Sequence, residues 1–203
     1  MLVRQLKLGP MDNFVYVFAR GGRGFVVDPG YEVPRLLREV EAMGVALTHV
    51  LVTHGHHDHI EGVQEVKRAT GALVAAHEKA DHPVDIPLQD GQTVELGRLR
   101  VEVRHTPGHR FDAACYVVEG THLLTGDTLF VGECGRVDLP GSDVGEMHRT
   151  LLTRLAALPG HLVVCPGHDY GETPTSTLEE ERRTNYTLRP RTREEFERFM
   201  REP

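Results

Sequence analysis

The heptapeptide at residues 53–59, which reads Thr-His-Gly-His-His-Asp-His, constrains this chain more than any other part of its sequence. It follows the apolar run at residues 49–52, which is typical of a buried strand. The spacing H-x-H-x-D-H indicates a loop too irregular to be one face of a helix, and Gly55 gives its backbone the freedom to bring several donors together. Imidazole and carboxylate groups bind transition metals. The pattern therefore predicts a metal site at a strand end, in preference to a solvated His-rich loop.

Histidine is the residue type that stands out in number, with 13 among the 203 residues. The imidazole side chain is the most common transition-metal ligand in proteins. Cysteine gives no comparable signal, because its three copies lie far apart and form no C-x-x-C pair. We therefore expect neither a disulfide framework nor a structural zinc knuckle from Cys115, Cys134 and Cys165.

Charge and hydropathy narrow the class of protein. A formal net charge of -7 argues against a nucleic-acid backbone as the main partner, since binding to phosphates relies on an excess of Lys and Arg. No run approaches the roughly 18 to 20 apolar residues that span a bilayer. The first ten residues mix Arg4 and Lys7 into a strand-like pattern, so we expect a cytoplasmic protein without a cleaved signal and without membrane contact.

The first ninety residues read as a hairpin followed by alternating strands and helices. Residues 13–19 and 25–27 predict two strands joined by a glycine-rich turn. Apolar residues at helical spacing predict a helix at residues 34–43 and a second one at about 60–70, each stopping at a glycine. Residues 81–91 read as a loop.

The second part of the chain repeats the strand-rich pattern and ends in helices. Strands are predicted at residues 93–96, 99–104, 115–118, 122–124 and 162–165, with a helix at about 144–158. Thr177 and Thr192 each precede a glutamate by three residues, which is the spacing of a capping box. We expect one domain over residues 1–203, with short C-terminal helices from about 177 and layers in the order helix, sheet, sheet, helix.

Three further residues have the position and chemistry to complete a metal site. His109, Asp127 and His168 each follow a predicted strand and lie beside a glycine, where the backbone can approach a metal closely. Ligand sites gather at the carboxyl ends of strands in open sheets, a rule for parallel sheets that we extend here by analogy. Two histidines with a third from elsewhere form an open catalytic site, and a carboxylate with a histidine offers ligands for a second ion.

Four short motifs carry a family resemblance: Thr53-His54-x-His56-x-Asp58-His59, Thr106-Pro107-Gly108-His109, Thr125-Gly126-Asp127-Thr128-Leu129-Phe130 and Pro166-Gly167-His168. Over nearly its whole length the chain resembles the metallo-β-lactamase superfamily, specifically its glyoxalase II and persulfide dioxygenase-like branch. The resemblance implies an α/β fold, the four-layer αβ/βα sandwich. It also implies two ions, the first held by His54, His56 and His109 and the second by Asp58, His59 and His168, with Asp127 bridging. His57 falls at a variable position and is left out of this set.

The same resemblance implies a reaction. Two divalent ions, of zinc, iron or manganese, would lower the pKa of a shared water, and the resulting hydroxide would attack a thioester of the hydroxyacylglutathione type. Asp58 and Asp127 are the catalytic carboxylates of this hypothesis. The segment at residues 134–136 resembles the Cys-Gly-Lys/Arg segment of the family, which makes Arg136 a candidate contact for a carboxylate of glutathione, with a plain surface role as the alternative.

Other reactions use the same ligands. The tail after His168 resembles that of the persulfide dioxygenases, which implies one iron on His54, His109 and Asp127 as an alternative. A metal-dependent phosphodiesterase is less favoured because of the acidic net charge, and a non-catalytic metal protein because the ligand set leaves open positions. The sequence predicts a hydrolase of a small thioester or thiol-derived substrate, with a dioxygenase as second choice.

Two further aspartates are relevant to this site. Asp28, in a Val-Asp-Pro-Gly turn, is a candidate for ordering a ligand histidine through a hydrogen bond, although a plain turn role is equally consistent with it. After His109 the chain departs from the family, with Arg110 and Asp112 where small residues are usual. Arg110 either contacts an anionic substrate or pairs with Asp112 at the surface, and we favour the surface pair.

Overall fold

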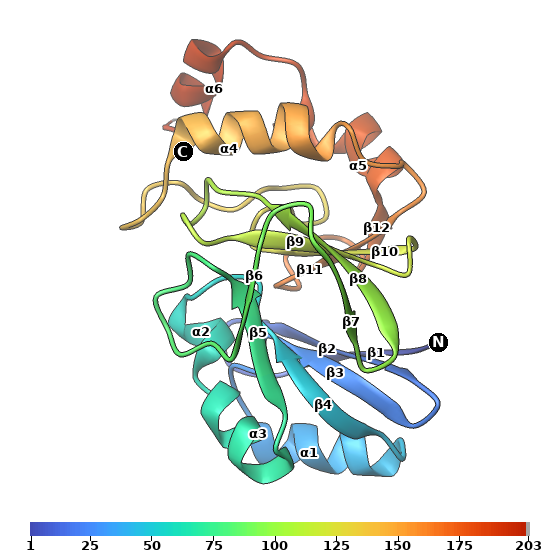
Figure 1. Cartoon of the computed structure of the whole chain (residues 1–203). Helices are drawn as coiled ribbons and strands as arrows, with labels where there is room; N and C mark the ends of the chain where they lie inside the picture. The colour runs from blue at the N-terminus through green and yellow to red at the C-terminus, as the bar shows by residue number, and fades with distance from the viewer. Residues whose placement is uncertain (202–203) are drawn as a thin grey trace.

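In the computed structural model, which describes residues 1–201, two six-stranded sheets pack face to face between two layers of helices (Figure 1). The helices α1, α2 and α3 cover the outer face of the first sheet, and α4, α5 and α6 lie on the outer side of the second. This order of layers is the predicted αβ/βα sandwich, so the expected fold class is confirmed.

The first sheet has the strand order β1-β2-β3-β4-β5-β6. Its first three strands are antiparallel neighbours, whereas β3 to β6 run parallel. The helix α1 connects β3 to β4, α2 and α3 connect β4 to β5, and a loop connects β5 to β6. The elements of this half are β1 (Leu2–Lys7), β2 (Phe14–Arg20), β3 (Arg23–Val27), α1 (Val33–Ala42), β4 (Ala46–Leu51), α2 (His57–Ile60), α3 (Val63–Thr70), β5 (Leu73–His77) and β6 (Ile86–Leu88).

The second sheet has the order β12-β11-β10-β9-β8-β7, and all its neighbours are antiparallel except β10 and β11. The helix α4 continues into a π-helical segment, η1, and a short 3₁₀ turn, η2, joins α5 to α6. The elements are β7 (Thr93–Leu96), β8 (Leu99–His105), β9 (Ala114–Val118), β10 (His122–Gly126), α4 (Val144–Arg149), η1 (Thr150–Leu155), β11 (Val163–Pro166), β12 (Ser176–Thr177), α5 (Leu178–Thr184), η2 (Tyr186–Leu188) and α6 (Arg193–Phe199).

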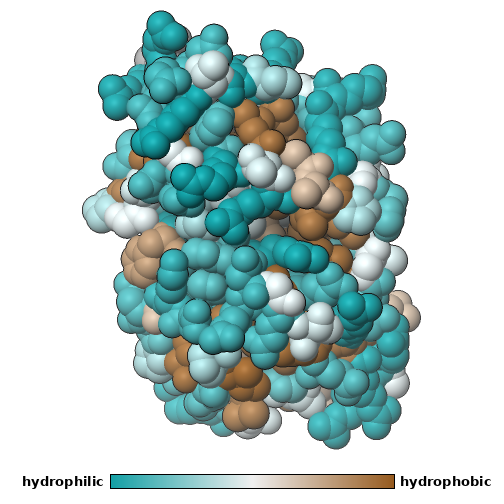
Figure 2. Space-filling view, turned by 45° about the horizontal axis from the view of Figure 1, so that its top comes forward, coloured by the Kyte–Doolittle hydropathy of each residue, from teal (hydrophilic) through white to brown (hydrophobic). Residues whose placement is uncertain are grey.

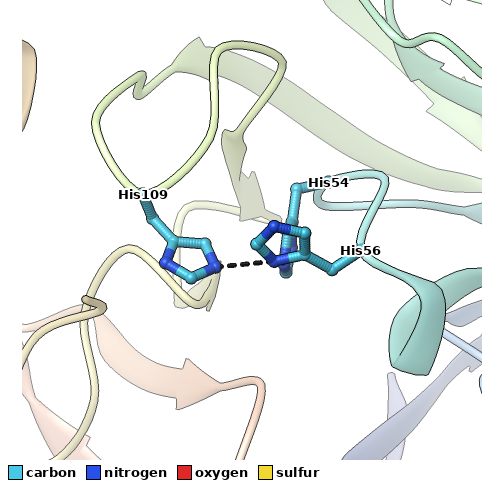
Figure 3. Close-up of side chains that lie close together, drawn as sticks. All are labelled: His54, His56 and His109. Carbon is cyan, nitrogen blue, oxygen red and sulfur yellow. Dashed lines mark hydrogen bonds between the residues drawn. The ribbon is translucent and has the colours of Figure 1, made fainter. Parts of the chain in front are cut away.

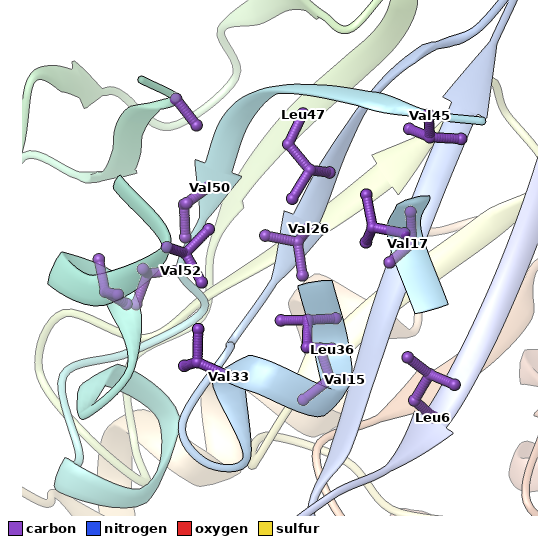
Figure 4. Close-up of a cluster of buried hydrophobic side chains, with 14 of the residues drawn as sticks. Leu6, Val15, Val17, Val26, Val33, Leu36, Val45, Leu47, Val50 and Val52 are labelled. Atoms are coloured by element: carbon purple, nitrogen blue, oxygen red, sulfur yellow. The ribbon is translucent and has the colours of Figure 1, made fainter. Parts of the chain in front are cut away.

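The first sheet is held to its helices by an aliphatic cluster. Val33 and Leu36 of α1 are buried at helical spacing and face the buried side chains of Val26 and Val50 (Figure 4). Branched side chains pack well on a pleated sheet, and each fully buried one contributes roughly 1.5 to 3 kcal/mol to the free energy of unfolding. This packing fixes the strand β4, whose carboxyl end leads into the His-rich segment.

The two sheets meet in a second core that contains more aromatic side chains. The rings of Phe18 and Phe25 stack with centroids 5.5 Å apart, and both are fully buried. They belong to the same cluster as Leu99 of β8 and Tyr116 of β9. The hydroxyl of Tyr116 donates to the carbonyl of Val52 at 2.8 Å, so this core also joins the second sheet to the chain just before the His-rich segment.

In the first half of the chain the structure differs from the sequence predictions in three places. The expected loop at residues 81–91 contains β6, a three-residue edge strand that was missed because it is short and includes a proline. The helix predicted at about 60–70 is divided, since the chain turns at Glu61 and Gly62 between α2 and α3. The His-rich segment is not wholly irregular either, because Asp58 and His59 lie in the short helix α2.

Polar and charged side chains cover most of the face seen in Figure 2, and apolar side chains reach it only in small patches. This agrees with the burial of the apolar clusters within the layers. Among residues 1–201, no helix combines the length and the apolar character that crossing a bilayer requires.

Candidate metal centre

All seven predicted ligand side chains lie together at one edge of the sandwich, where the ends of four strands meet. The segment after β4 supplies His54 and His56, and α2 supplies Asp58 and His59. The other three follow strands of the second sheet: His109 after β8, Asp127 directly after β10 and His168 after β11. The centre therefore draws its donors from both sheets.

The first group of donors consists of three imidazoles (Figure 3). The Nδ1 atom of His56 lies 3.1 Å from Nε2 of His54 and 2.9 Å from Nε2 of His109. His54 and His109 are buried, and His56 is partly exposed. One cation can therefore be reached by a nitrogen of each ring, an arrangement that leaves a coordination position for water or substrate.

The second group consists of one carboxylate and two imidazoles: Asp58, His59 and His168. The Nε2 atoms of His59 and His168 are 3.2 Å apart, and Nε2 of His168 lies 3.3 Å from Oδ2 of Asp58. Asp58 is held in place by Asn13, whose Nδ2 donates to its carboxylate at 2.9 Å. This group faces the same interior space as the first.

Asp127 lies between the two groups. Its Oδ2 atom is 3.6 Å from Nε2 of His109 and 3.3 Å from Nε2 of His168, and its Oδ1 atom is 3.3 Å from Nε2 of His59. A single carboxylate thus reaches nitrogens of both donor groups. This is the geometry that a bridging ligand needs.

Contacts outside the cluster orient the rings of His59, His109 and His168 so that Nε2 points inward. The Nδ1 atoms of His109 and His168 donate to backbone carbonyls at 2.8 Å, and Nδ1 of His59 lies 3.0 Å from Oδ2 of Asp28. Such contacts fix the tautomer and position of a metal-binding histidine. Asp28 therefore has the ordering contact proposed for it from the sequence, and it also accepts from the backbone N–H of Thr53 at 2.7 Å.

The donor set fits transition-metal ions. Oδ1 of Asp127 is buried and has no hydrogen-bond partner within residues 1–201, which is a costly state for a carboxylate oxygen unless a cation satisfies it. Gly167 leaves the room for this oxygen, since a Cβ atom there would lie 2.4 Å from it. Mixed imidazole and carboxylate ligands suit zinc, iron and manganese.

The two groups differ in their electrostatics. Burial lowers the pKa of His54, and burial lowers that of His56 to about 4, so these two rings are neutral imidazoles that can bind metal directly. At His168, burial is outweighed by hydrogen bonds to Asp127 and Asp58, which raise its pKa to about 9. Burial alone would raise the pKa of Asp58, but His168, His59 and Asn13 lower it to about 2.

A cavity of about 470 Å³ opens above the cluster, and its walls are largely apolar. The ring of Tyr170 stacks on that of His168, with centroids 4.7 Å apart, and Phe130 contacts both rings edge-on. Leu139 and Met11 also line the cavity. The sequence analysis gave these wall residues no role, and the nearest signal was the position of Phe130 at the end of the Asp127 motif and of Tyr170 two residues after His168.

Two candidate residues outside the ligand set are placed as follows. Arg136 lines the cavity, but its side chain is 62% exposed and forms two hydrogen bonds of 2.6 Å with Asp138. Arg110 pairs with Asp112 at 2.6 Å, but the expectation that this pair lies at the surface was wrong, because both side chains are buried. His57 is exposed and pairs with Glu61, outside the donor groups.

Comparison with known proteins identifies the family. Residues 8–168 match the family model described as the metallo-beta-lactamase superfamily, and the chain belongs to that superfamily. A hydroxyacylglutathione hydrolase of Anaeromyxobacter dehalogenans is 40% identical over 161 residues, which are 78% of this chain and 62% of that protein. The chain thus spans less than two thirds of the length of that relative.

Two solved structures are similar over nearly the whole chain. The crystal structure of ETHE1 from Myxococcus xanthus has a TM-score of 0.93 and 31% identity, covering 100% of this chain and 91% of that one. The crystal structure of TTHA1623 in a di-iron-bound form has a TM-score of 0.80 and 32% identity, covering 91% of this chain and 100% of that one. The predicted family is therefore confirmed.

Proposed function

We propose that this protein is a metal-dependent hydrolase of a thioester of the hydroxyacylglutathione type. The observation that carries the proposal is the position of Asp127, whose two oxygens reach imidazoles of both donor groups. The 40% identity to a hydroxyacylglutathione hydrolase supports the choice of substrate. We further infer a single domain that works in the cytoplasm, where three cysteines without disulfides in the described part of the chain fit a reducing compartment. The last two residues of that domain lie outside the described residues.

The seven clustered side chains are the proposed ligands of two ions. His54, His56 and His109 would hold the first and Asp58, His59 and His168 the second, with Asp127 shared. Such ions, when bound, lower the pKa of a coordinated water toward neutrality and polarise a carbonyl oxygen. Zinc, iron and manganese all suit these donors, and a similar structure is described in a di-iron-bound form.

The residues of the chain itself position the substrate and the ligands. Asp58 and Asp127 supply negative charge that offsets two divalent ions, and Asn13 keeps Asp58 directed at the centre. Phe130 and Tyr170 form an apolar wall against which the thioester lies, which limits the access of bulk water. Arg136 contacts a carboxylate of the thiol moiety once it exchanges its partner Asp138 for the substrate.

A mononuclear iron dioxygenase for persulfides is the second candidate. Two histidines and one carboxylate form the ligand set of many iron oxygenases, and Nε2 of His109 lies 3.6 Å from Oδ2 of Asp127 with His54 beside them. The similarity to ETHE1 over the whole chain fits this alternative. A phosphodiesterase has no comparable support.

The substitution His168→Ala distinguishes the two candidates, because His168 belongs to the second donor group and lies outside the iron triad. In a hydrolase with two ions, one ion is lost and thioester hydrolysis falls by orders of magnitude. In a dioxygenase with one iron, the metal stays and oxygen consumption falls by roughly 10- to 100-fold at most. The measurement is metal content with both activities, S-lactoylglutathione hydrolysis and oxygen consumption with glutathione persulfide.

The matched control is His161→Ala, since His161 is exposed and its one side-chain hydrogen bond within residues 1–201 is to the carbonyl of Gly120. It should leave metal content and activity unchanged. A wild-type protein that binds a single iron, consumes oxygen with the persulfide and hydrolyses no thioester would overturn the hydrolase assignment.

A further inference from the structure

Arg110 directly follows the ligand His109, and its guanidinium lies inside the protein instead of in solvent. The residue is only 8% exposed. Its Nη1 atom lies 2.6 Å from Oδ2 of Asp112, and its Nη2 atom donates to Oδ2 of Asp81 at 2.6 Å. Asp112 is also buried, whereas the side chain of Asp81 is 55% exposed. Contacts with two carboxylates give this guanidinium a fixed position, because its planar, forked group has to meet both partners at once.

Asp112 connects this ion pair to the other ligand loop. Its Oδ2 atom accepts a hydrogen bond from the backbone N–H of Gly55 at 3.0 Å. Gly55 lies between the ligands His54 and His56, so the bond holds the backbone from which both rings extend. A Cβ atom at Gly55 would lie only 2.6 Å from Nη1 of Arg110, so the absence of a side chain lets this backbone lie directly against the ion pair.

The first residue of the His-rich segment, Thr53, has a comparable anchor. Asp28 accepts from the backbone N–H of Thr53 at 2.7 Å and from its hydroxyl at 2.5 Å, and it contacts His59. The segment is thus held by two buried aspartates from different parts of the chain. Asp28 lies beside the second donor group, whereas Asp112 acts on the backbone of the first.

We propose that Arg110 and Asp112 are positioning residues that set the distance between His109 and the pair His54 and His56, and so the affinity of the first donor group for its ion. The inference rests on the ligand assignment of the proposed function. The physical reason is that His109 and Arg110 are consecutive, while Arg110 reaches Gly55 through Asp112, so one buried ion pair joins the loops that carry all three imidazoles. Ligand bonds of about 2 Å tolerate little displacement of either loop.

The test compares metal binding by Asp112→Asn, Arg110→Met and Arg110→Lys with that of the wild type. Each metal-free protein is titrated with cobalt(II) against a chelator of known affinity, and the absorption bands separate a three-imidazole site from a mixed carboxylate and imidazole site. We expect Asp112→Asn and Arg110→Met to weaken the three-imidazole site by about tenfold, as loss of an outer contact does, and to leave the other site within about twofold. Arg110→Lys retains one charged contact and should be intermediate.

Asp81→Asn is the matched control, because it removes the exposed partner of the same guanidinium and leaves the bond from Asp112 to Gly55 intact. It should bind cobalt as the wild type does. Thermal unfolding of each metal-free variant identifies any that do not fold. If Arg110→Met does not fold, the metal affinity of Arg110→Lys is compared with that of the wild type in its place.

Two results would overturn the inference: unchanged affinity at the three-imidazole site in folded Asp112→Asn, or equal weakening of both sites, which indicates general loosening. Because the measurement is metal affinity, a wild type that binds two ions but hydrolyses no thioester would reject the proposed function and leave this inference standing. A wild type that binds no ion would reject both.

Discussion

Gly167 shows how closely the backbone approaches the centre at the scale of single residues. Its N–H donates to the carbonyl of Gly126, and its carbonyl accepts from the N–H of Phe14, both at 2.8 Å. The backbone is therefore held on two sides and cannot withdraw. A Cβ atom would lie 2.4 Å from Oδ1 of Asp127 and 2.9 Å from Cε1 of His59, so an added methyl group must displace a proposed ligand.

We predict that Gly167→Ala lowers the metal content by at least one ion and reduces the free energy of unfolding by roughly 1 to 3 kcal/mol, as overpacking does. Metal analysis after dialysis, together with urea denaturation, measures both effects. Gly160→Ala is the control, since its nearest neighbour is the side chain of Glu179 at 3.1 Å, far from the centre in the fold. Full metal content in Gly167→Ala would show that Asp127 does not depend on this space.

Sequence analysis identified the site residues that lie within a motif or a turn. His54 to His59 share one segment, and His109, Asp127 and His168 each follow a strand, so their positions depend on local patterns. The burial of Arg110 and Asp112 was not predictable in this way. It depends on the path of two loops that pack against each other, which spacing along the chain does not encode.

At the scale of elements, α5 and the turn after it hold one wall of the cavity. Nδ2 of Asn185 donates to the carbonyl of Glu133 at 3.1 Å and to the carboxylate of Glu181 at 2.8 Å. Glu181 in turn accepts from the backbone N–H of Gly132 at 2.8 Å. The loop fixed in this way carries Phe130, so a C-terminal helix determines the shape of the cavity.

The substitution Asn185→Ala should therefore destabilise the protein by about 1 to 3 kcal/mol, because it leaves buried polar groups without partners. It should also raise KM for the thioester more than it lowers kcat. The reason is that the substitution disturbs the cavity wall that contacts the substrate and not the proposed metal ligands. Chemical denaturation and steady-state kinetics test this. Glu180→Gln on the exposed side of α5 is the control and should stay within about 0.5 kcal/mol of wild type. A loss of kcat alone would contradict this role.

The elements differ in how well their sequence predicted them. The helices α5 and α6 begin after Thr177 and Thr192, and each threonine side chain accepts from the backbone N–H three residues on, but only Thr192 forms the complete capping box with its glutamate, Glu195. The strand β6 and the short helix α2 were missed, since β6 depends on pairing with β5 and α2 is too short for a periodic pattern. Tertiary packing decides such short elements.

At the scale of the whole molecule, the core between the two sheets holds the two halves of the protein together. We predict that Leu99→Ala, in that core, reduces the free energy of unfolding by about 2 to 5 kcal/mol, because a cavity remains between the sheets. Leu73→Ala, on a strand but 45% exposed, is the matched control and should cost less than about 1 kcal/mol. Urea denaturation gives both values, and similar losses would mean that the sheets do not depend on this core.

The origin of the donors in both sheets has a consequence for how the protein survives in a cell. If the seven side chains hold ions, each ion ties the first half of the chain to the second and acts as a reversible cross-link. At an ion concentration a thousand times the Kd, such binding adds about 4 kcal/mol to the free energy of unfolding. The lifetime of the protein against proteolysis would then follow the supply of metal, so that starvation for metal removes the polypeptide and not merely its activity.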